Sequence, residues 1–159
     1  MLLSSELTAV PVQFPIKHIL VPYDGSKYAN HAFQFAFSLA KKLGANVSII
    51  AIMKKNESSK YSWGDSSHET IIDEKTRERL NKLFQSLELD AKENKISLKS
   101  EIITSSTIAD SIILFASKRK ADLIIMGTRG HGFARPNMRL GSIAIDVSQN
   151  SKCPVMLVH

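Results

Sequence analysis

Continuous apolar runs alternate along the chain with longer segments whose apolar residues recur at helical spacing. Apolar runs without regular polar interruption are typical of parallel strands that are buried on both faces of a sheet. In one run, Lys99 and Glu101 alternate with apolar residues, which predicts a strand near the edge of the sheet. The runs predict strands at residues 16–23, 47–53, 96–104, 123–126 and 154–158.

The segments between these runs are predicted to be helices. Ser26 and Gly44 are the residue types that begin and end a helix, so the first helix is expected between them. Thr107 and Asp110 have the spacing of a capping box at the start of the third helix, which ends near residue 120. The second and fourth helices are predicted at residues 69–94 and 142–150.

The alternation of strands and helices predicts an α/β fold. We expect a single doubly wound domain over residues 16–159, with a five-stranded parallel sheet and helices on both faces. Residues 1–15 are expected to form an irregular arm, because two prolines disfavour a helix or a central strand. Residues 54–68 are expected to form a polar loop that is longer than most connections.

The composition is that of a globular protein. Hydrophobic residues make up 43% and charged residues 23% of the chain, which are ordinary values for a folded domain. Cys153 is the single cysteine, so an internal disulfide and a multi-cysteine zinc site are excluded and a reducing compartment is favoured. No apolar run approaches the roughly 20 residues that span a membrane, and the N-terminus is not a convincing signal peptide. We therefore expect cytoplasmic localisation and no membrane partner.

The net charge of +6 favours anionic ligands, but the basic residues are distributed along the whole sequence. Lys75, Arg77 and Arg79, for example, are interspersed with acidic residues, as on a solvated helix face. Clustering of the basic residues and stacking aromatic residues are both missing. The sequence therefore does not favour a nucleic-acid partner.

The run 123–126 leads into a glycine-rich segment that begins at Gly127 and ends at Gly141-Ser142. A buried strand followed by a glycine loop and a helix N-terminus is typical of an anion site, because backbone N–H groups and the helix dipole both attract negative charge. In doubly wound sheets, ligands bind beyond the carboxyl ends of the strands where the strand order reverses. Pro22-Tyr23-Asp24 ends the first predicted strand and is expected on the same rim.

Other nucleotide and metal signatures are absent from the sequence. There is no G-x-x-x-x-G-K-[ST] phosphate loop, and YDGSKYAN rather than G-x-G-x-x-G follows the first predicted strand. No H-E-x-x-H motif or Cys/His cluster indicates a metal site. No catalytic constellation emerges either, because Asp24 is the only obvious carboxylate on the rim. Slow ATP hydrolysis stays an open alternative.

The glycine spacing, together with IKHILVPYDGS near the start and KCPVMLV at the end, resembles the universal stress protein family from about Lys17 to Val158. The resemblance implies a five-stranded parallel fold of the adenine nucleotide alpha hydrolase type. It also implies a homodimer through the C-terminal strand Val155–Val158, whose edge would otherwise be open. In the nucleotide-binding branch, ATP lies between the glycine loop and the end of the first strand.

The resemblance also implies positions for an adenine nucleotide, which is ATP with or without Mg, ADP or AMP. Asp24 can accept hydrogen bonds from sugar hydroxyls or base amines, or alternatively cap the first helix. Ser142 can cap its helix and donate to a phosphate oxygen. Pro22, Tyr23 and Asp24 are placed beside the adenine and ribose, Ile52 is a further apolar wall, and Met126, Gly127, Gly130, Gly141, Ser142 and Ile143 surround the ribose and phosphates.

The glycine loop departs from the family pattern at one point. Ten residues, His131 to Leu140, separate Gly130 from Gly141 where the pattern has nine, and Pro136 removes a backbone donor. The extra residue can be absorbed as a bulge or can weaken triphosphate binding, whereas the loop cations favour phosphate. These cations are Arg129, His131, Arg135 and Arg139.

The leading hypothesis is an ATP-binding universal stress protein that acts as a nucleotide-dependent regulatory or protective module in stress response. One alternative is a nucleotide-free dimeric interaction scaffold of the same fold. The other is a slow ATPase.

Overall fold

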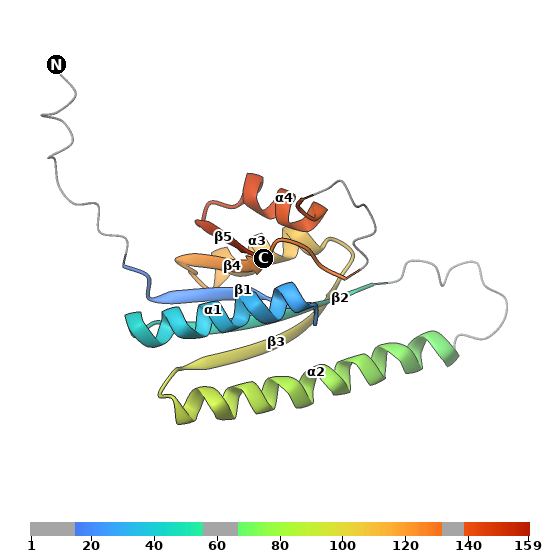
Figure 1. Cartoon of the computed structure of the whole chain (residues 1–159). Helices are drawn as coiled ribbons and strands as arrows, with labels where there is room; N and C mark the ends of the chain where they lie inside the picture. The colour runs from blue at the N-terminus through green and yellow to red at the C-terminus, as the bar shows by residue number, and fades with distance from the viewer. Residues whose placement is uncertain (1–14, 56–66, 132–138) are drawn as a thin grey trace, which may run out of the picture.

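The computed structural model describes residues 15–55, 67–131 and 139–159 and contains a five-stranded sheet in the order β3-β2-β1-β4-β5 (Figure 1). Every pair of neighbouring strands is parallel. The strand order reverses between β1 and β4. The strands are β1 (His18–Pro22), β2 (Asn46–Lys54), β3 (Leu98–Ser105), β4 (Leu123–Gly127) and β5 (Val155–Val158), and the helices are α1 (Lys27–Leu43), α2 (Ser67–Glu93), α3 (Ile108–Lys118) and α4 (Ser142–Asn150).

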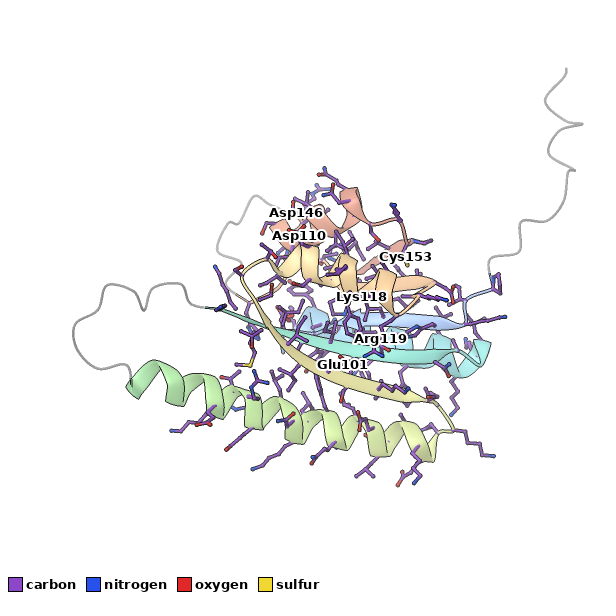
Figure 2. The ribbon with its side chains drawn as sticks, turned by 180° about the vertical axis from the view of Figure 1, so that it is seen from behind. Glu101, Asp110, Lys118, Arg119, Asp146 and Cys153 are labelled. Atoms are coloured by element: carbon purple, nitrogen blue, oxygen red, sulfur yellow. The ribbon has the colours of Figure 1, made fainter. Side chains whose placement is uncertain are left out.

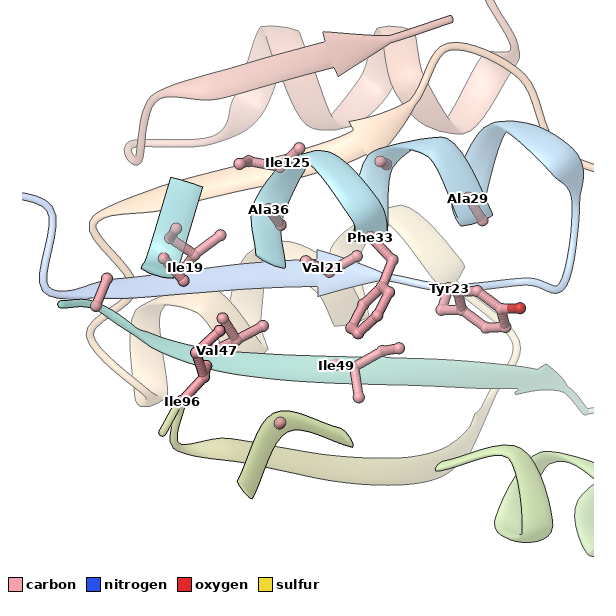
Figure 3. Close-up of a cluster of buried hydrophobic side chains, with 14 of the residues drawn as sticks. Ile19, Val21, Tyr23, Ala29, Phe33, Ala36, Val47, Ile49, Ile96 and Ile125 are labelled. Atoms are coloured by element: carbon pink, nitrogen blue, oxygen red, sulfur yellow. The ribbon is translucent and has the colours of Figure 1, made fainter. Parts of the chain in front are cut away.

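The helices lie on both faces of the sheet. α1 and α2 cover one face, where Ile19 and Val21 of β1 join the larger cluster of buried side chains (Figure 3). α3 and α4 cover the other face, where Leu20 of β1 joins the second cluster. β1 is therefore buried on both sides, which explains its continuous apolar sequence. The predicted doubly wound fold is confirmed, and β3, which contains Lys99 and Glu101, lies at a sheet edge as expected.

The predicted ends of the first helix are confirmed. Ser26 is the N-cap residue, and its Oγ accepts a hydrogen bond from the backbone N–H of Ala29 at 3.1 Å. Gly44 ends α1 with a φ of 66°, a left-handed conformation that glycine adopts without steric cost. The predicted strand and helix limits otherwise differ from the observed ones by no more than about two residues, as is usual for fraying ends.

The predicted capping box at α3 is wrong. Thr107 is the N-cap residue, but its side chain makes no capping hydrogen bond. Ser105 Oγ instead accepts the backbone N–H of Thr107 at 3.1 Å, and Ser111 Oγ donates to the carbonyl oxygen of Thr107 at 2.8 Å. The backbone donor that a capping box would satisfy is thus already taken, and the aspartate at 110 is one methylene shorter than the glutamate the motif prefers.

Some predictions fall outside the described residues. They concern residues 1–14, most of the polar loop, and Arg135 and Pro136 in the glycine segment. Among the helices of the described part, none is long and apolar enough to cross a membrane. Within the same residues, no three His, Cys, Asp or Glu side chains are grouped so that they could hold a metal ion.

Tyr23, which follows β1, has its ring buried on the α1/α2 face rather than turned to the other side of the sheet (Figure 3). The ring is 7% exposed and contacts Phe84 edge-on, with the ring centroids 5.9 Å apart. Its hydroxyl donates to Asn30 Oδ1 at 2.6 Å. Burial, and secondarily the charge of Asp24, raises the pKa of Tyr23 above its usual value of 10.0.

The raised pKa of Tyr23 makes stability depend on alkaline pH. The folded protein binds the phenolic proton more tightly than the unfolded chain, so the stability from this group is complete below the unfolded pKa and is lost as the pH rises through the folded pKa. We expect Tyr23→Phe to lower the free energy of unfolding by about 1 kcal/mol at neutral pH and to reduce its alkaline fall. Urea unfolding between about pH 8 and 11 measures both effects. Tyr28→Phe is the control, and an equal change in slope there would contradict the assignment.

Candidate functional site

A cavity of about 360 Å³ opens at the carboxyl ends of β1 and β4, where the strand order reverses. This volume lies within the range of small-molecule sites. The two lips of the cavity come from the segments that follow β1 and β4, as the sequence pattern predicts. The structure places all ten predicted site residues in its lining, namely Pro22, Tyr23, Asp24, Ile52, Met126, Gly127, Gly130, Gly141, Ser142 and Ile143.

The inner wall of the cavity is apolar. Ile50 of β2, Ile112 of α3 and Met126 of β4 are at most 5% exposed, and Ile108 of α3 is half-buried beside them. Such a surface is suited to a flat heterocycle or another apolar group. Sequence reasoning assigned no site role to α3, because Ile108 and Ile112 have the i, i+4 spacing of ordinary core residues. It also missed Ala29, Ile50, Thr128 and Ala144.

Asp24 connects the two lips of the cavity. Its Oδ1 accepts the backbone N–H of Ser26 at 2.9 Å, and its Oδ2 accepts the backbone N–H of His131 at 3.0 Å. The alternative prediction that Asp24 caps α1 is wrong, because Ser26 occupies the N-cap position. Each carboxylate oxygen retains lone pairs beyond these two bonds, so Asp24 can still accept a hydrogen bond from a ligand.

Gly127 and Gly130 are both packed too closely for a side chain, but against different groups. A Cβ atom on Gly127 would lie 2.7 Å from Tyr28 Cβ and 2.8 Å from the Tyr28 carbonyl carbon, at the start of α1. A Cβ atom on Gly130 would lie 2.5 Å from Asp24 Oδ2. The structure therefore gives both glycines a role in packing within the protein, in addition to the ligand approach expected from sequence.

The first turn of α4 presents backbone donors at the cavity. Gly141 is the N-cap residue, so the prediction that Ser142 caps the helix is wrong: Ser142 is the first helical residue. Ile145 makes the first intrahelical bond, from its N–H to the carbonyl oxygen of Gly141 at 3.0 Å. The N–H groups of Ser142, Ile143 and Ala144 precede that bond and have no intrahelical acceptor. A glycine cap also offers them no side chain, so this end is suited to an anion.

Thr128, which lines the cavity, is hydrogen-bonded to the edge strand β5 and to the N-cap residue of α4. It is 2% exposed, its N–H donates to the carbonyl oxygen of Val158 at 2.9 Å, and its carbonyl oxygen accepts the N–H of Gly141 at 2.8 Å. Thr128 Oγ1 lies 3.2 Å from His159 Nδ1. His31 Nδ1 donates in turn to the carbonyl oxygen of His159 at 2.9 Å, which joins α1 to this group. These long-range contacts fix the position of the α4 N-terminus.

The sequence and the overall structure both match known proteins. The model of the universal stress protein family matches residues 15–159. The chain belongs to this family. A universal stress protein of Methanocaldococcus jannaschii, MJ0531, is 32% identical to it over 147 residues, which cover 89% of this chain and 81% of that protein.

Solved structures of the family share the fold of this universal stress protein. The hypothetical protein MJ0577 superposes with a TM-score of 0.75 at 22% identity, covering 91% of this chain and 96% of that one. A universal stress protein in complex with cAMP has a TM-score of 0.66 at 19% identity, with 91% and 98% coverage. One from Archaeoglobus fulgidus in complex with dAMP has a TM-score of 0.58 at 18% identity, with 92% and 100% coverage. At these identities the likeness establishes the fold alone.

The described lining of the cavity in this universal stress protein carries one arginine and one carboxylate. Arg129 and His131 belong to the lining, and Arg129 Nε donates to the carbonyl oxygen of Arg139 at 3.2 Å. The Arg129 guanidinium also lies 6.0 Å from the centroid of the Tyr28 ring. Asp24 is the only carboxylate among the described lining residues. The cavity thus combines an apolar wall, one acceptor group and a cationic, donor-rich side.

Proposed function

We propose that this universal stress protein binds an adenine nucleotide in the cavity and acts in the cytoplasm as a nucleotide-dependent regulatory or protective module. ATP, with or without Mg, is the leading ligand, and ADP and AMP are the other candidates. The observation that carries the proposal is the lining of the cavity, which contains both an apolar wall and the backbone donors at the start of α4. An adenine ring needs the first of these surfaces and a phosphate group needs the second, within one site.

Each part of a nucleotide has a matching group in the lining. The adenine is placed against Ile52, Ile108 and Ile112, and the ribose beside Asp24. We place the phosphates at the first turn of α4, where Arg129 also belongs to the lining. The two similar family members in complex with cAMP and dAMP support an adenine nucleotide rather than another anion.

The ligand can be identified directly. We expect the purified protein, when unfolded in nucleotide-free buffer, to release an adenine nucleotide that mass spectrometry identifies. Calorimetry of the emptied protein with Mg-ATP, ADP and AMP then ranks the candidates, and Mg-GTP, which has the same phosphates on a different base, is the matched control. Release of no adenine nucleotide, together with no heat from any of the three, would contradict the proposal.

We further propose a homodimer that forms through β5. This strand pairs only with β4 within the chain, and its four apolar residues are only partly buried. An apolar edge strand of this kind is normally covered in a native protein. Light scattering is expected to give twice the chain mass at micromolar concentration, and a monomeric mass there would count against the dimer.

A nucleotide-free interaction scaffold is the second candidate function. The observation that favours it is that both oxygens of Asp24 already accept hydrogen bonds from the protein itself. Deleting one residue between His131 and Leu140 restores the nine-residue family spacing and separates the two functions. If the extra residue prevents binding, the deletion variant will bind Mg-ATP and the parent chain will not.

Any slow ATPase activity should be lost in Asp24→Asn, since Asp24 is the only carboxylate of the described lining.

A further inference from the structure

Basic side chains that are scattered in the sequence gather at the end of the sheet opposite the cavity. Five described segments there, 15–17, 41–46, 90–97, 117–122 and 151–154, lead into the amino ends of the five strands. The strand order places them side by side. Backbone hydrogen bonds from Asn46 to Lys17 and from Asp122 to His18 join the three central segments. Those from Val47 to Ser97 and from Ile124 to Pro154 join the outer two. This end is on the left of the sheet in Figure 1, where α1 and α2 finish. We call these five segments the basic rim.

The basic rim holds most of the charge excess of the whole protein, and one of its charges is paired with Glu101 of β3 beside it. It contains three carboxylates, those of Asp90, Glu93 and Asp122, and nine exposed basic side chains. The difference equals the net charge of +6 of the entire sequence. Arg119 forms a salt bridge with Glu101 of β3 (Figure 2). The nine basic residues are Lys17, Lys41, Lys42, Lys92, Lys95, Lys118, Arg119, Lys120 and Lys152.

Helix dipoles explain only part of this cluster. Lysines in the last turns of α1, α2 and α3 interact favourably with the negative helix ends. Lys17, Lys95, Lys120 and Lys152 lie outside the helices.

Two of these lysines occupy positions that suit glycine better. Lys95 and Lys120 have φ values of 58° and 51°, the left-handed conformation that Gly44 adopts with a φ of 66° after α1. The chain therefore keeps a lysine at two positions where glycine would be the more stable choice. Backbone conformation does not account for lysine at these two positions, so the charges need a reason other than local geometry.

We propose that the basic rim is a docking surface for the phosphate backbone of double-helical nucleic acid. Five strands spaced about 4.8 Å apart extend the rim over about 19 Å, the length of roughly six phosphates on one strand of a duplex. Eight of the nine cations are lysines, which bind phosphates as point charges and do not read base sequence. Binding is therefore independent of sequence and sensitive to salt.

The apolar side chains of the rim favour a duplex over other polyanions. The described rim contains no aromatic residue, so bases of a single strand have no stacking surface. Leu43, 49% exposed, is the one large apolar side chain exposed in these segments. A membrane-surface site needs a broad apolar face beside its charges, and a single leucine does not provide one.

Fluorescence anisotropy with a labelled duplex of about 20 base pairs, between about 50 and 200 mM salt, tests the proposal. The rim variant is Lys95→Gly/Lys120→Gly/Lys152→Gln. It removes three charges, and its two glycines match left-handed positions, so its Tm should be equal or higher. The matched control is Lys75→Gln/Arg79→Gln/Lys82→Gln, which removes three exposed charges from the part of α2 that precedes the rim segment 90–97.

We expect the rim variant to bind the duplex about 10-fold or more weakly, with a log–log salt slope shallower by up to about 2.7. The control variant should stay within about 2-fold of the parent chain, because contacts at the rim, not total charge, are lost. Equal losses in the two variants would assign binding to total charge and overturn the proposal. So would tighter binding to the single strand than to the duplex, or binding to phosphatidylserine vesicles without binding to the duplex. Because the cavity lies at the other end of the strands, Mg-ATP affinity should be the same in both variants.

Discussion

Gly127→Ala is expected to lower the free energy of unfolding by about 3 kcal/mol, the upper end of the cost of overpacking. For a chain of 159 residues this corresponds to a fall in Tm of roughly 6–12 °C. The added Cβ would lie 2.7 Å from Tyr28 Cβ, 2.8 Å from the Tyr28 carbonyl carbon and 3.1 Å from the Ala29 nitrogen. These atoms belong to the backbone of α1 or are directly attached to it, so no rotamer change relieves the clash and α1 has to move away from β4.

Two other glycines provide controls for Gly127→Ala, measured by thermal and urea unfolding. A Cβ on Gly141 would come no closer than 3.5 Å to its nearest neighbour, and Gly44 has no neighbour within 4 Å. Gly141→Ala should cost about 1 kcal/mol or less through its N-cap position, and Gly44→Ala about 1 kcal/mol through its left-handed backbone. If Gly127→Ala lowers the free energy of unfolding no more than these two substitutions do, the close contact between β4 and α1 does not require a glycine at position 127.

The fold could be predicted from the sequence because its signals are local. Buried parallel strands give continuous apolar runs. Ser26 begins α1 through its side-chain oxygen, and Gly44 ends it through its left-handed backbone. The position of the site could be predicted from topology, since the residues after β1 and β4 must meet where the strand order reverses. No contact between distant side chains was needed for either conclusion.

The remaining features depend on contacts between distant residues. Ile112 has the spacing of a core residue, and only the position of α3 shows that it also lines the cavity. Tyr23 precedes Asp24 in sequence, yet its ring is buried in the cluster under α1 and α2. Successive residues of an extended chain alternate between the two faces of a sheet, so the ring points away from the α3 side. Thr128 acquires its role from Val158, Gly141 and His159, which no local pattern connects.

The basic rim illustrates the same limit for charge. Lys118, Arg119 and Lys120 form one short run, but Lys17, Lys95 and Lys152 are far apart in sequence. Their spacing does not indicate that they join this run at one end of the sheet. In a parallel sheet, however, every connection from a helix to the next strand reaches the same end. Charges in such connections gather without being neighbours in sequence. A count of basic runs therefore underestimates charge clustering in this class of fold.

Asp24→Ala and Gly130→Ala are each expected to weaken adenine-nucleotide binding about 10- to 100-fold, the value of one hydrogen bond to a charged group. Asp24 Oδ2 holds the N–H of His131 at 3.0 Å and so fixes the glycine segment beside the proposed ribose position. A Cβ on Gly130 would lie 2.5 Å from the same oxygen, so the alanine displaces the carboxylate. Both substitutions thus remove the hydrogen bond between His131 and Asp24, one by deleting the carboxylate and the other by displacing it.

The double variant tests this common cause. With Asp24 replaced by alanine, the Gly130→Ala side chain has nothing to displace, so the double variant should bind Mg-ATP about as well as Asp24→Ala alone. Calorimetry measures the affinities, and Asp110→Ala removes an exposed carboxylate outside the cavity lining as the control. Losses that multiply in the double variant would show that the two residues act separately.

Hydrogen exchange provides a readout of the Asp24 contact that needs no ligand. The amide of His131 should lose protection in Asp24→Ala and Gly130→Ala alike, because both remove its acceptor. Stability should fall by only about 1 kcal/mol in each, since a carboxylate side chain can rotate into solvent and the freed N–H groups can bind water. Lost protection without lost affinity would mean that Asp24 holds the glycine segment but does not contribute to the nucleotide site. Unchanged protection would mean that the loop is positioned independently of Asp24.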